Sequence, residues 1–216
     1  MTAVARYVLA DYMRSQRYLP QLVSYLGFLA IFYAFPGTAL PGYGASAAAL
    51  LPISVWLALS LHNTEDPLQA AVTIVNAGSR WRVTIGKTSA ALAGVLALSG
   101  IAVIWPMVSS GMLHTPTDLA VGLFAHLTCG ITGVALGTCC TRPIIKRQGY
   151  AFATALLLGL IALVSRLLSP ANQTIRLLSG APPRPSFTEL LLLMGWALIM
   201  LVALTSMSSW LAQRRR

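Results

Sequence analysis

The sequence predicts an all-α membrane protein with six transmembrane helices, and three observations support this fold class. Hydrophobic residues make up 56% of the 216 residues and charged residues only 9%, against about 25% charged in a soluble domain. Six apolar stretches approach the roughly 20 residues that a helix needs to cross a bilayer. None alternates with the two-residue period of a membrane barrel strand, so the backbone must form its hydrogen bonds within helices.

The six predicted spans form one transmembrane domain over residues 1–216. They cover residues 18–35, 45–61, 88–107, 118–140, 150–168 and 187–211. Before them, residues 1–17 form an amphipathic segment, with one apolar and one basic face: Val4, Val8, Leu9 and Tyr12 against Arg6, Arg14 and Arg17. We expect this segment to be an elbow helix at the level of the lipid headgroups, with a solvated helical tail as the alternative.

The distribution of basic residues predicts the orientation. With the N-terminus in the cytoplasm, twelve of the fifteen lysines and arginines lie inside, and only Arg166, Arg176 and Arg184 lie outside. Such a bias over short loops predicts cytoplasmic N- and C-termini, in a multi-pass protein of a cell membrane. The net charge of +10 does not indicate nucleic-acid binding, because no basic face is interleaved with aromatic residues.

The longest polar interruption, residues 62–87, contains signals for a short cytoplasmic helix between spans two and three. Thr64 can cap a helix whose first turn holds Glu65, Asp66 and a proline, and Gly78 can end it. Leu68, Val72 and Val75 recur at helical spacing and form one apolar side. We predict that this helix docks on a partner, with an ordinary surface helix as the alternative.

The end of this loop carries a misleading motif. Gly86, Lys87 and Thr88 match the last three residues of a phosphate-binding loop, but that pattern needs a glycine where Trp81 stands and a preceding strand. We therefore expect no nucleotide-binding site and no bound cofactor in this chain.

Ionisable residues within the spans are candidates for function, because burying them in a membrane is costly. His126 shares a helical face with Cys129, and we expect a hydrogen-bonded histidine between helices, with metal or proton chemistry as the alternative. Arg166 and Glu189 lie near the outer ends of spans, where Arg166 can anchor the helix and Glu189 can cap a helix or pair with an arginine. His126, Arg166 and Glu189 are also the candidate gate or substrate contacts. No set of residues typical of catalysis is present.

Small residues in the fourth predicted span indicate close helix packing. Gly133 and Gly137 form a GxxxG pair, with Gly130 in the same stretch. Glycines at this spacing let two helix backbones approach, within one chain or across a dimer. Residues 169–186, between spans five and six, combine an apolar centre with a proline cluster, which favours a short helix or re-entrant turn at the outer surface.

The loop combines a glutamate, a helix, and then a turn with S-R-W-R and G-K before the third span. The residues that form this pattern are Glu65, Ser79, Arg80, Trp81, Arg82, Gly86 and Lys87. With this pattern the loop resembles that of the ABC-type exporter permeases, the six-span membrane subunits of drug, antibiotic and polysaccharide exporters. The chain departs from the family pattern in three ways: in the turn at Asn76–Gly78, in the middle of the loop helix, and in its total length of 216 residues, which is short for the family. The elbow and the outer segment fit the same family.

The resemblance implies a transport subunit that is not itself an enzyme. Two separate ABC ATPase subunits, which hold ATP and magnesium, would drive it, and a second permease copy or a related permease would complete a homodimer or heterodimer in the lipid bilayer. The contacts to the ATPase would be Glu65, Asp66, Leu68, Val72, Ser79, Arg80, Trp81 and Arg82. The cargo would be a hydrophobic or amphipathic small molecule or peptide. The alternatives are a membrane-embedded enzyme that uses His126 and a non-transporting immunity or adaptor protein.

Overall fold

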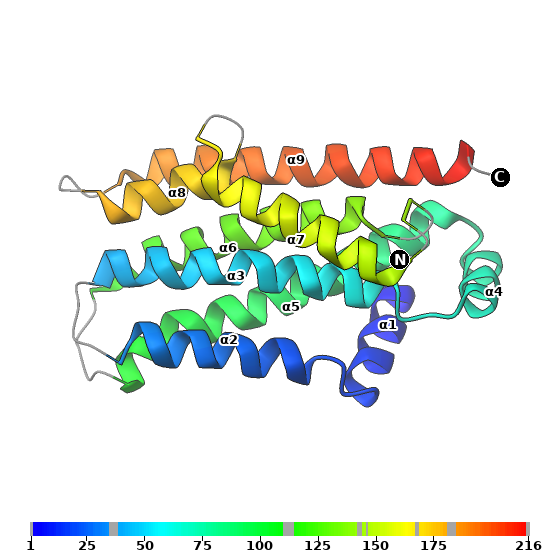
Figure 1. Cartoon of the computed structure of the whole chain (residues 1–216), viewed down its shortest axis with the longest axis horizontal. Helices are drawn as coiled ribbons and strands as arrows, with labels where there is room; N and C mark the ends of the chain where they lie inside the picture. Colours follow the sequence, from blue (N-terminus) through cyan, green and yellow to red (C-terminus); the bar gives the residue numbers. More distant parts are fainter. Residues whose placement is uncertain are drawn as a thin grey trace.

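The structure, a computed structural model, describes residues 2–34, 39–109, 115–141, 144–145, 147–166, 169–180 and 185–214. Over these residues the chain is helical and contains no strand (Figure 1). The helices are α1 (Thr2–Arg14), α2 (Leu19–Phe32), α3 (Ala39–His62), α4 (Pro67–Ala77), α5 (Arg80–Ser109), α6 (Pro116–Cys139), α7 (Gln148–Val164), α8 (Pro170–Ser179) and α9 (Phe187–Arg214). The predicted all-α class is confirmed.

Four of these helices are long and apolar enough to cross a membrane, and they indicate a membrane-embedded protein. They lie at Leu40–His62, Arg80–Ser109, Pro116–Cys139 and Phe187–Ala212. The first and fifth predicted spans correspond to α2 and α7, which are apolar but have only 14 and 17 residues. At 1.5 Å per residue these reach about 21 and 26 Å, less than the roughly 30 Å of a hydrocarbon core. Six complete crossings therefore remain a prediction.

Helix α6 lies at the centre of the bundle because its glycines let it approach α3 closely. A Cβ atom on Gly133 would stand 2.5 Å from the carbonyl oxygen of Leu51, and one on Gly137 would stand 2.8 Å from that of Val55. A Cβ atom on Gly130 would overlap the side chain of Val95 in α5. All three glycines are buried within the chain. The predicted glycine motif thus packs α6 against its own neighbours.

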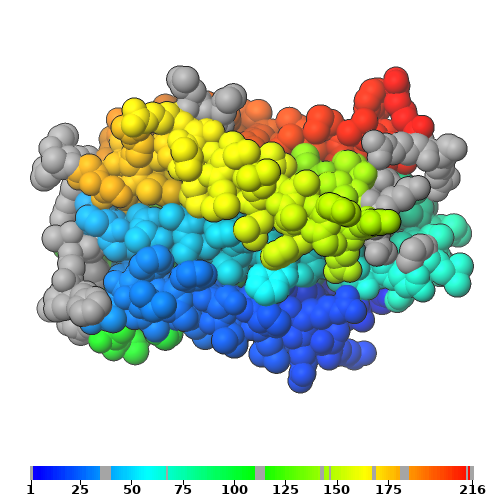
Figure 2. Space-filling view, viewed as in Figure 1, coloured from blue at the N-terminus to red at the C-terminus, as the bar shows by residue number. Residues whose placement is uncertain are grey.

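Helices α5 and α9 are far less buried than α3 and α6 and present apolar side chains to the outside. Leu96, Ile104, Ile199 and Val202 are all more than half exposed. Apolar residues on the periphery around a closely packed centre are what a lipid environment requires. In the space-filling view, α3 reaches the surface as a band between α2 and α7 (Figure 2).

The two ends of the bundle differ in construction. Helices α1 and α4 and the last turns of α9 lie together at one end, which we call the α4 end (Figure 1). There α1 runs steeply across the bundle direction and α4 projects beyond the long helices. Towards the opposite end α7 stops short, and α8 continues over the remaining distance beside α9 (Figure 1). Thus α8 is the short helix predicted within residues 169–186, of which 181–184 lie outside the described residues.

Candidate functional site

The predicted loop helix is α4, and local backbone chemistry sets its two ends. Asp66 is the N-cap residue and a proline opens the first turn. Thr64 was predicted as the cap, but its hydroxyl donates to the carbonyl oxygen of Ser60 at 2.6 Å and so bonds the last turn of α3 instead. At the other end Gly78 adopts a φ of 71°, the left-handed conformation that glycine tolerates best, and ends the helix as predicted.

A buried ion pair fixes the start of this loop to α5. The Oε2 atom of Glu65 lies 2.7 Å from Nζ of Lys87, and both residues are only 6% exposed. The hydroxyl of Thr73 in α4 donates to Oε1 of Glu65 at 2.6 Å, and Nζ of Lys87 donates to the carbonyl oxygen of His62 at 3.2 Å. One carboxylate and one ammonium group therefore join the end of α3, the middle of α4 and the start of α5.

This placement changes the role of Glu65 from the predicted one. The sequence places Glu65 among the residues that touch a partner, but its side chain points into the protein and is already bonded on both oxygens. Breaking a buried pair by removing one member strands a charge and costs about 3–5 kcal/mol. Glu65 and Lys87 thus hold α4 in position, and the contact surface must be formed by other residues.

The surface of α4 that faces outward is apolar. Leu68, Val72 and Val75 are 75%, 55% and 78% exposed, and Asp66 is exposed at the start of the helix. These are the residues predicted to form the apolar side of the helix, and the structure leaves them uncovered. Three neighbouring large apolar side chains on one projecting helix are a feature of protein interaction sites.

The S-R-W-R segment after α4 stabilises the turn rather than forming one contact surface. Nη1 of Arg82 donates to the carbonyl oxygen of Ala77 at 3.4 Å, at the C-terminal end of α4, where a positive charge is favoured. Nη1 of Arg80 donates to the carbonyl oxygen of Ala212 in α9 at 3.5 Å. Trp81 is 37% exposed, and Ser79 is partly exposed. Of these predicted contact residues, Trp81 and Arg82 lie at the surface.

Helix α1 also contacts α4. Nε2 of Gln69 donates to the hydroxyl of Tyr7 at 2.6 Å, and Val4, Tyr7, Val72 and Arg82 line a groove of about 650 Å³ between the two helices. The apolar face predicted for α1 is buried against protein, because Val8 and Tyr12 are nearly inaccessible. A Cβ atom on Gly86 would stand 2.7 Å from Cγ1 of Val4, so this glycine permits α1 to approach α5 closely.

The junction of α1, α2 and α3 is closed by a buried polar cluster. The hydroxyl of Tyr12 lies 2.6 Å from the side-chain amide of Gln21, which lies 2.9 Å from the hydroxyl of Ser60. Burial raises the pKa of the Tyr12 phenol well above its usual value, so it stays neutral at any physiological pH. Nη1 of Arg17 donates to the carbonyl oxygen of Thr64 at 3.4 Å, which connects this junction to the α4 loop.

His126 is a hydrogen-bonded histidine between helices. It is fully buried, with Nδ1 2.6 Å from the carbonyl oxygen of Gly122 and Nε2 2.9 Å from the hydroxyl of Ser46 in α3. Both ring nitrogens therefore have partners. Within the described ranges no group of three or more histidine, cysteine, aspartate or glutamate residues could hold a metal ion. His126 and Cys129 thus form no metal site with the residues that the structure places.

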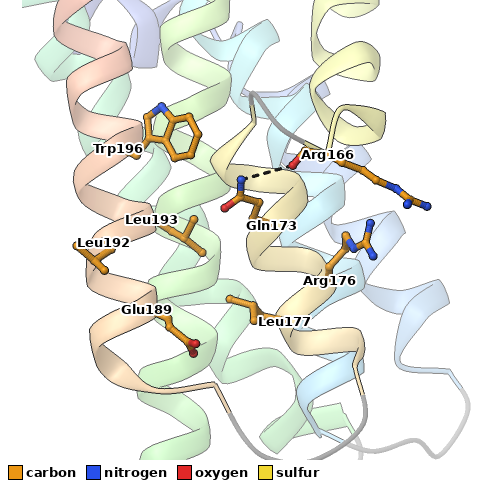
Figure 3. Close-up of a pocket in the computed structure, with 8 residues that line it drawn as sticks. All are labelled: Arg166, Gln173, Arg176, Leu177, Glu189, Leu192, Leu193 and Trp196. Atoms are coloured by element: carbon orange, nitrogen blue, oxygen red, sulfur yellow. Dashed lines mark hydrogen bonds between the residues drawn. The ribbon is translucent and has the colours of Figure 1, made fainter.

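The other two residues predicted as gate or substrate contacts, Arg166 and Glu189, line one groove between α8 and α9 (Figure 3). Glu189 also caps α9: its Oε2 accepts from the backbone N–H of Ser186 at 3.0 Å, and Oγ of Ser186 accepts from the N–H of Glu189 at 3.2 Å. This capping was one of the roles expected for Glu189. His126 does not line this groove.

Comparison of the chain with family models, curated proteins and solved structures gave no match. Two residues at the α4 end had no predicted role, His62 and Thr73, and the role of Gly86 in packing α1 against α5 was not predicted. Thr73 and Glu65 are eight residues apart, on different segments, and no short motif indicates their contact. The chain has only five acidic residues, and one of them, Glu65, lies in the same loop as the basic Lys87. This was the one signal in the sequence that could have indicated the ion pair.

Proposed function

We propose that the chain is the transmembrane permease subunit of an ATP-binding cassette transporter, driven through α4 by separate ATPase subunits. The observation that carries the proposal is the combination at the α4 end: a projecting helix with an uncovered apolar face that is fixed to α3 and α5 by a buried ion pair. An ordinary surface helix needs neither an exposed apolar face nor such attachment. The resemblance of the loop to exporter permeases supports the same function.

The proposed mechanism uses the attachment of α4 to transmit a displacement. The partner ATPase takes Leu68, Val72 and Val75 into a groove and moves α4 when it binds and hydrolyses ATP. Because Glu65 is bonded to both Thr73 and Lys87, a shift of α4 moves the start of α5 and the end of α3 with it. Such a shift does work only if the cargo binds the two resulting states with different affinities. A second permease copy completes the pathway.

The cargo class follows from the composition of the bundle. The spans expose apolar side chains and few charged ones, which fits a hydrophobic or amphipathic small molecule or peptide. Export as the direction of transport, and a bacterial inner membrane as the location, rest on the resemblance. The alternative of an enzyme that uses His126 is weakened because both ring nitrogens are bonded within the chain.

Co-expression with an ABC ATPase subunit from the same genome tests the proposal, and an ATPase encoded in an adjacent reading frame would be the first choice. We expect the two to co-purify, and ATP hydrolysis and cargo flux in proteoliposomes to require both. Replacing the exposed Leu68 and Val75 by glutamate should abolish co-purification and flux, because charges then enter an apolar contact, while the melting temperature in detergent stays unchanged.

The matched control is Gln148→Glu, which adds a charge at an exposed position of the same end but outside α4. We expect it to leave flux intact. Unchanged complex formation and flux in the Leu68→Glu and Val75→Glu variant would refute the docking role of α4. ATP hydrolysis without any flux in the wild-type complex would favour an immunity or adaptor protein.

A further inference from the structure

A second surface, the groove between α8 and α9, has a chemistry that the proposed function does not use. It has a volume of about 650 Å³ and is lined by Arg166, Gln173, Arg176, Leu177, Glu189, Leu192, Leu193 and Trp196 (Figure 3). Polar side chains come mainly from α8 and the segment before it, and apolar ones mainly from α9. The groove is therefore amphipathic across its width.

The position of Arg166 along the bundle is unusual for a charged residue. Figure 3 shows Arg166 level with Trp196, whereas Glu189 lies at the opposite end of the groove. Trp196 follows the first residue of α9 by nine positions, which at 1.5 Å per residue is about 13 Å. Because α9 is one of the helices long enough to cross a membrane, Arg166 lies well inside its length. An ionisable residue at such a depth is a functional candidate.

The chain breaks its helical structure beside Arg166, and side chains compensate for the break. Ser165 ends α7, and the freed carbonyl oxygens of Leu163 and Arg166 accept from the side-chain amides of Asn172 and Gln173. Irregular backbone at membrane depth is tolerated where protein covers it or where it lines a polar cavity. Here the side chains of Asn172 and Gln173 meet the first condition, since they bond the freed carbonyl oxygens.

The two arginines of the groove have no carboxylate partner in the part of the chain that the structure describes. Both Arg166 and Arg176 are exposed and line the groove, although in Figure 3 their guanidinium groups extend to the side of α8 away from α9. Glu189 is the one acidic residue of the lining, and its Oε2 already accepts from the N–H of Ser186. The lining thus has one net positive charge and two guanidinium groups available to an anion.

An apolar stripe continues from the groove along α9. Leu192, Trp196 and Ile199 follow each other at spacings of four and three residues and therefore lie on one face. They are 69%, 39% and 70% exposed. An anion that used both features would carry a hydrocarbon chain beside its charged group.

We propose that this groove binds one anionic phospholipid, with its phosphate at Arg166 and Arg176 and an acyl chain along Leu192, Trp196 and Ile199. The proposal does not depend on the transport function. A zwitterionic lipid fits less well, because its ammonium group meets the same two guanidinium groups. Free inorganic phosphate satisfies the arginines but leaves the apolar stripe uncovered.

The test is native mass spectrometry of the full chain in detergent with an equimolar mixture of phosphatidylglycerol and phosphatidylcholine. We expect one phosphatidylglycerol to be retained in preference to phosphatidylcholine. Arg166→Gln and Arg176→Gln should each lower its occupancy about fivefold, because one basic residue at a membrane surface changes the affinity for anionic lipid by about that factor. Glu189→Gln should raise the occupancy, since it removes the one negative charge and keeps a capping oxygen.

Arg147→Gln is the matched control, because Arg147 is exposed at the other end of α7; it should leave occupancy unchanged. Arg166→Lys keeps the charge and should keep most of the binding, which separates loss of charge from misfolding. Equal retention of the two lipids, or an equal loss in Arg147→Gln, would overturn the proposal. So would displacement of the lipid by millimolar inorganic phosphate, or full binding in Leu192→Asn and Ile199→Asn, because the site would then recognise only a phosphate group.

Discussion

The α4 end and the groove between α8 and α9 each combine a glutamate with basic residues, yet the structure uses the two carboxylates differently. At the α4 end Glu65 is buried and pairs with Lys87 at 2.7 Å, and its second oxygen accepts from Thr73. In the groove between α8 and α9, Glu189 is exposed and bonds the backbone N–H of Ser186, while Arg166 and Arg176 have no carboxylate partner within the described ranges. The charges at the α4 end are therefore paired within the chain, whereas the two arginines of the α8–α9 groove are available to an anion.

This difference separates positioning from recognition. A buried pair whose charges are satisfied internally offers nothing to a ligand, but it makes the helix that carries it rigid. Unpaired guanidinium groups beside an apolar stripe are available to bind. The difference is consistent with the two proposals, force transmission at the α4 end and lipid recognition in the α8–α9 groove, and substitutions that remove one charge at a time can test both.

The largest effect is expected for Lys87→Met. Removing the ammonium group leaves Glu65 buried without a counter-charge, which costs about 3–5 kcal/mol in the free energy of unfolding. The same variant frees α4 from α5, so cargo flux should be lost as well. Unfolding of the purified protein in detergent, followed by circular dichroism against denaturant, gives the free energy.

Two controls accompany this variant. Arg147→Met removes an exposed basic residue from the same end and should change the stability by less than about 0.5 kcal/mol. The double variant Glu65→Met and Lys87→Met removes both charges and should recover most of the lost stability, but not the flux, because an apolar pair of this kind is often as stable as the ion pair. A double variant as unstable as Lys87→Met would show that the pair itself is not what matters.

A smaller loss of stability is expected for Gly133→Ala. This variant tests how much the close contact between α3 and α6 contributes to stability, compared with the ion pair at the α4 end. The added Cβ atom would stand 2.5 Å from the carbonyl oxygen of Leu51, so α6 must move away from α3. Overpacking of this kind costs about 1–3 kcal/mol. The melting temperature in detergent should fall accordingly.

Gly100→Ala is the control, because a Cβ atom there meets nothing within 4 Å and alanine is the better helix former. Its melting temperature should stay equal or rise. If Gly133→Ala lowers the free energy of unfolding more than Lys87→Met does, the stability of the bundle depends mainly on the contact between α3 and α6. The α4 end and the α8–α9 groove would then differ in function but not in their contribution to stability.

The sequence predicted those features that depend on local periodicity. The apolar faces of α4 and α1, the end of α4 at Gly78 and the close packing at Gly133 all follow from residue types and spacing along one helix, whereas the burial of the α1 face against the bundle, in place of the expected lipid headgroups, does not. The cap of α4 was wrong because Thr64 bonds the preceding turn at Ser60, and a single sequence does not show which of two adjacent helices a hydroxyl serves.

Features that depend on contacts between distant segments were not predictable in this way. Glu65 and Lys87 were each identified, one as a partner contact and one as a basic residue after the loop, but nothing in their spacing shows that the chain folds back to bring them together. Arg166 was expected near a surface, and only the break between α7 and α8 places it beside the interior turns of α9. The helices could thus be predicted from the sequence, whereas the ion pair at the α4 end and the α8–α9 groove depend on how those helices are connected and packed.

The smallest effect is expected for Glu189→Gln, and it sharpens the comparison most. The amide oxygen of glutamine can still accept from the N–H of Ser186, so the stability should change by less than about 0.5 kcal/mol, against a loss of several for the equivalent Glu65→Gln. The difference follows from burial: Glu65 is 6% exposed, whereas Glu189 lies at the surface. Denaturant titration of the two variants side by side checks it. Similar losses in both would mean that Glu189 also neutralises a buried charge, and the groove would then not be open to an anion.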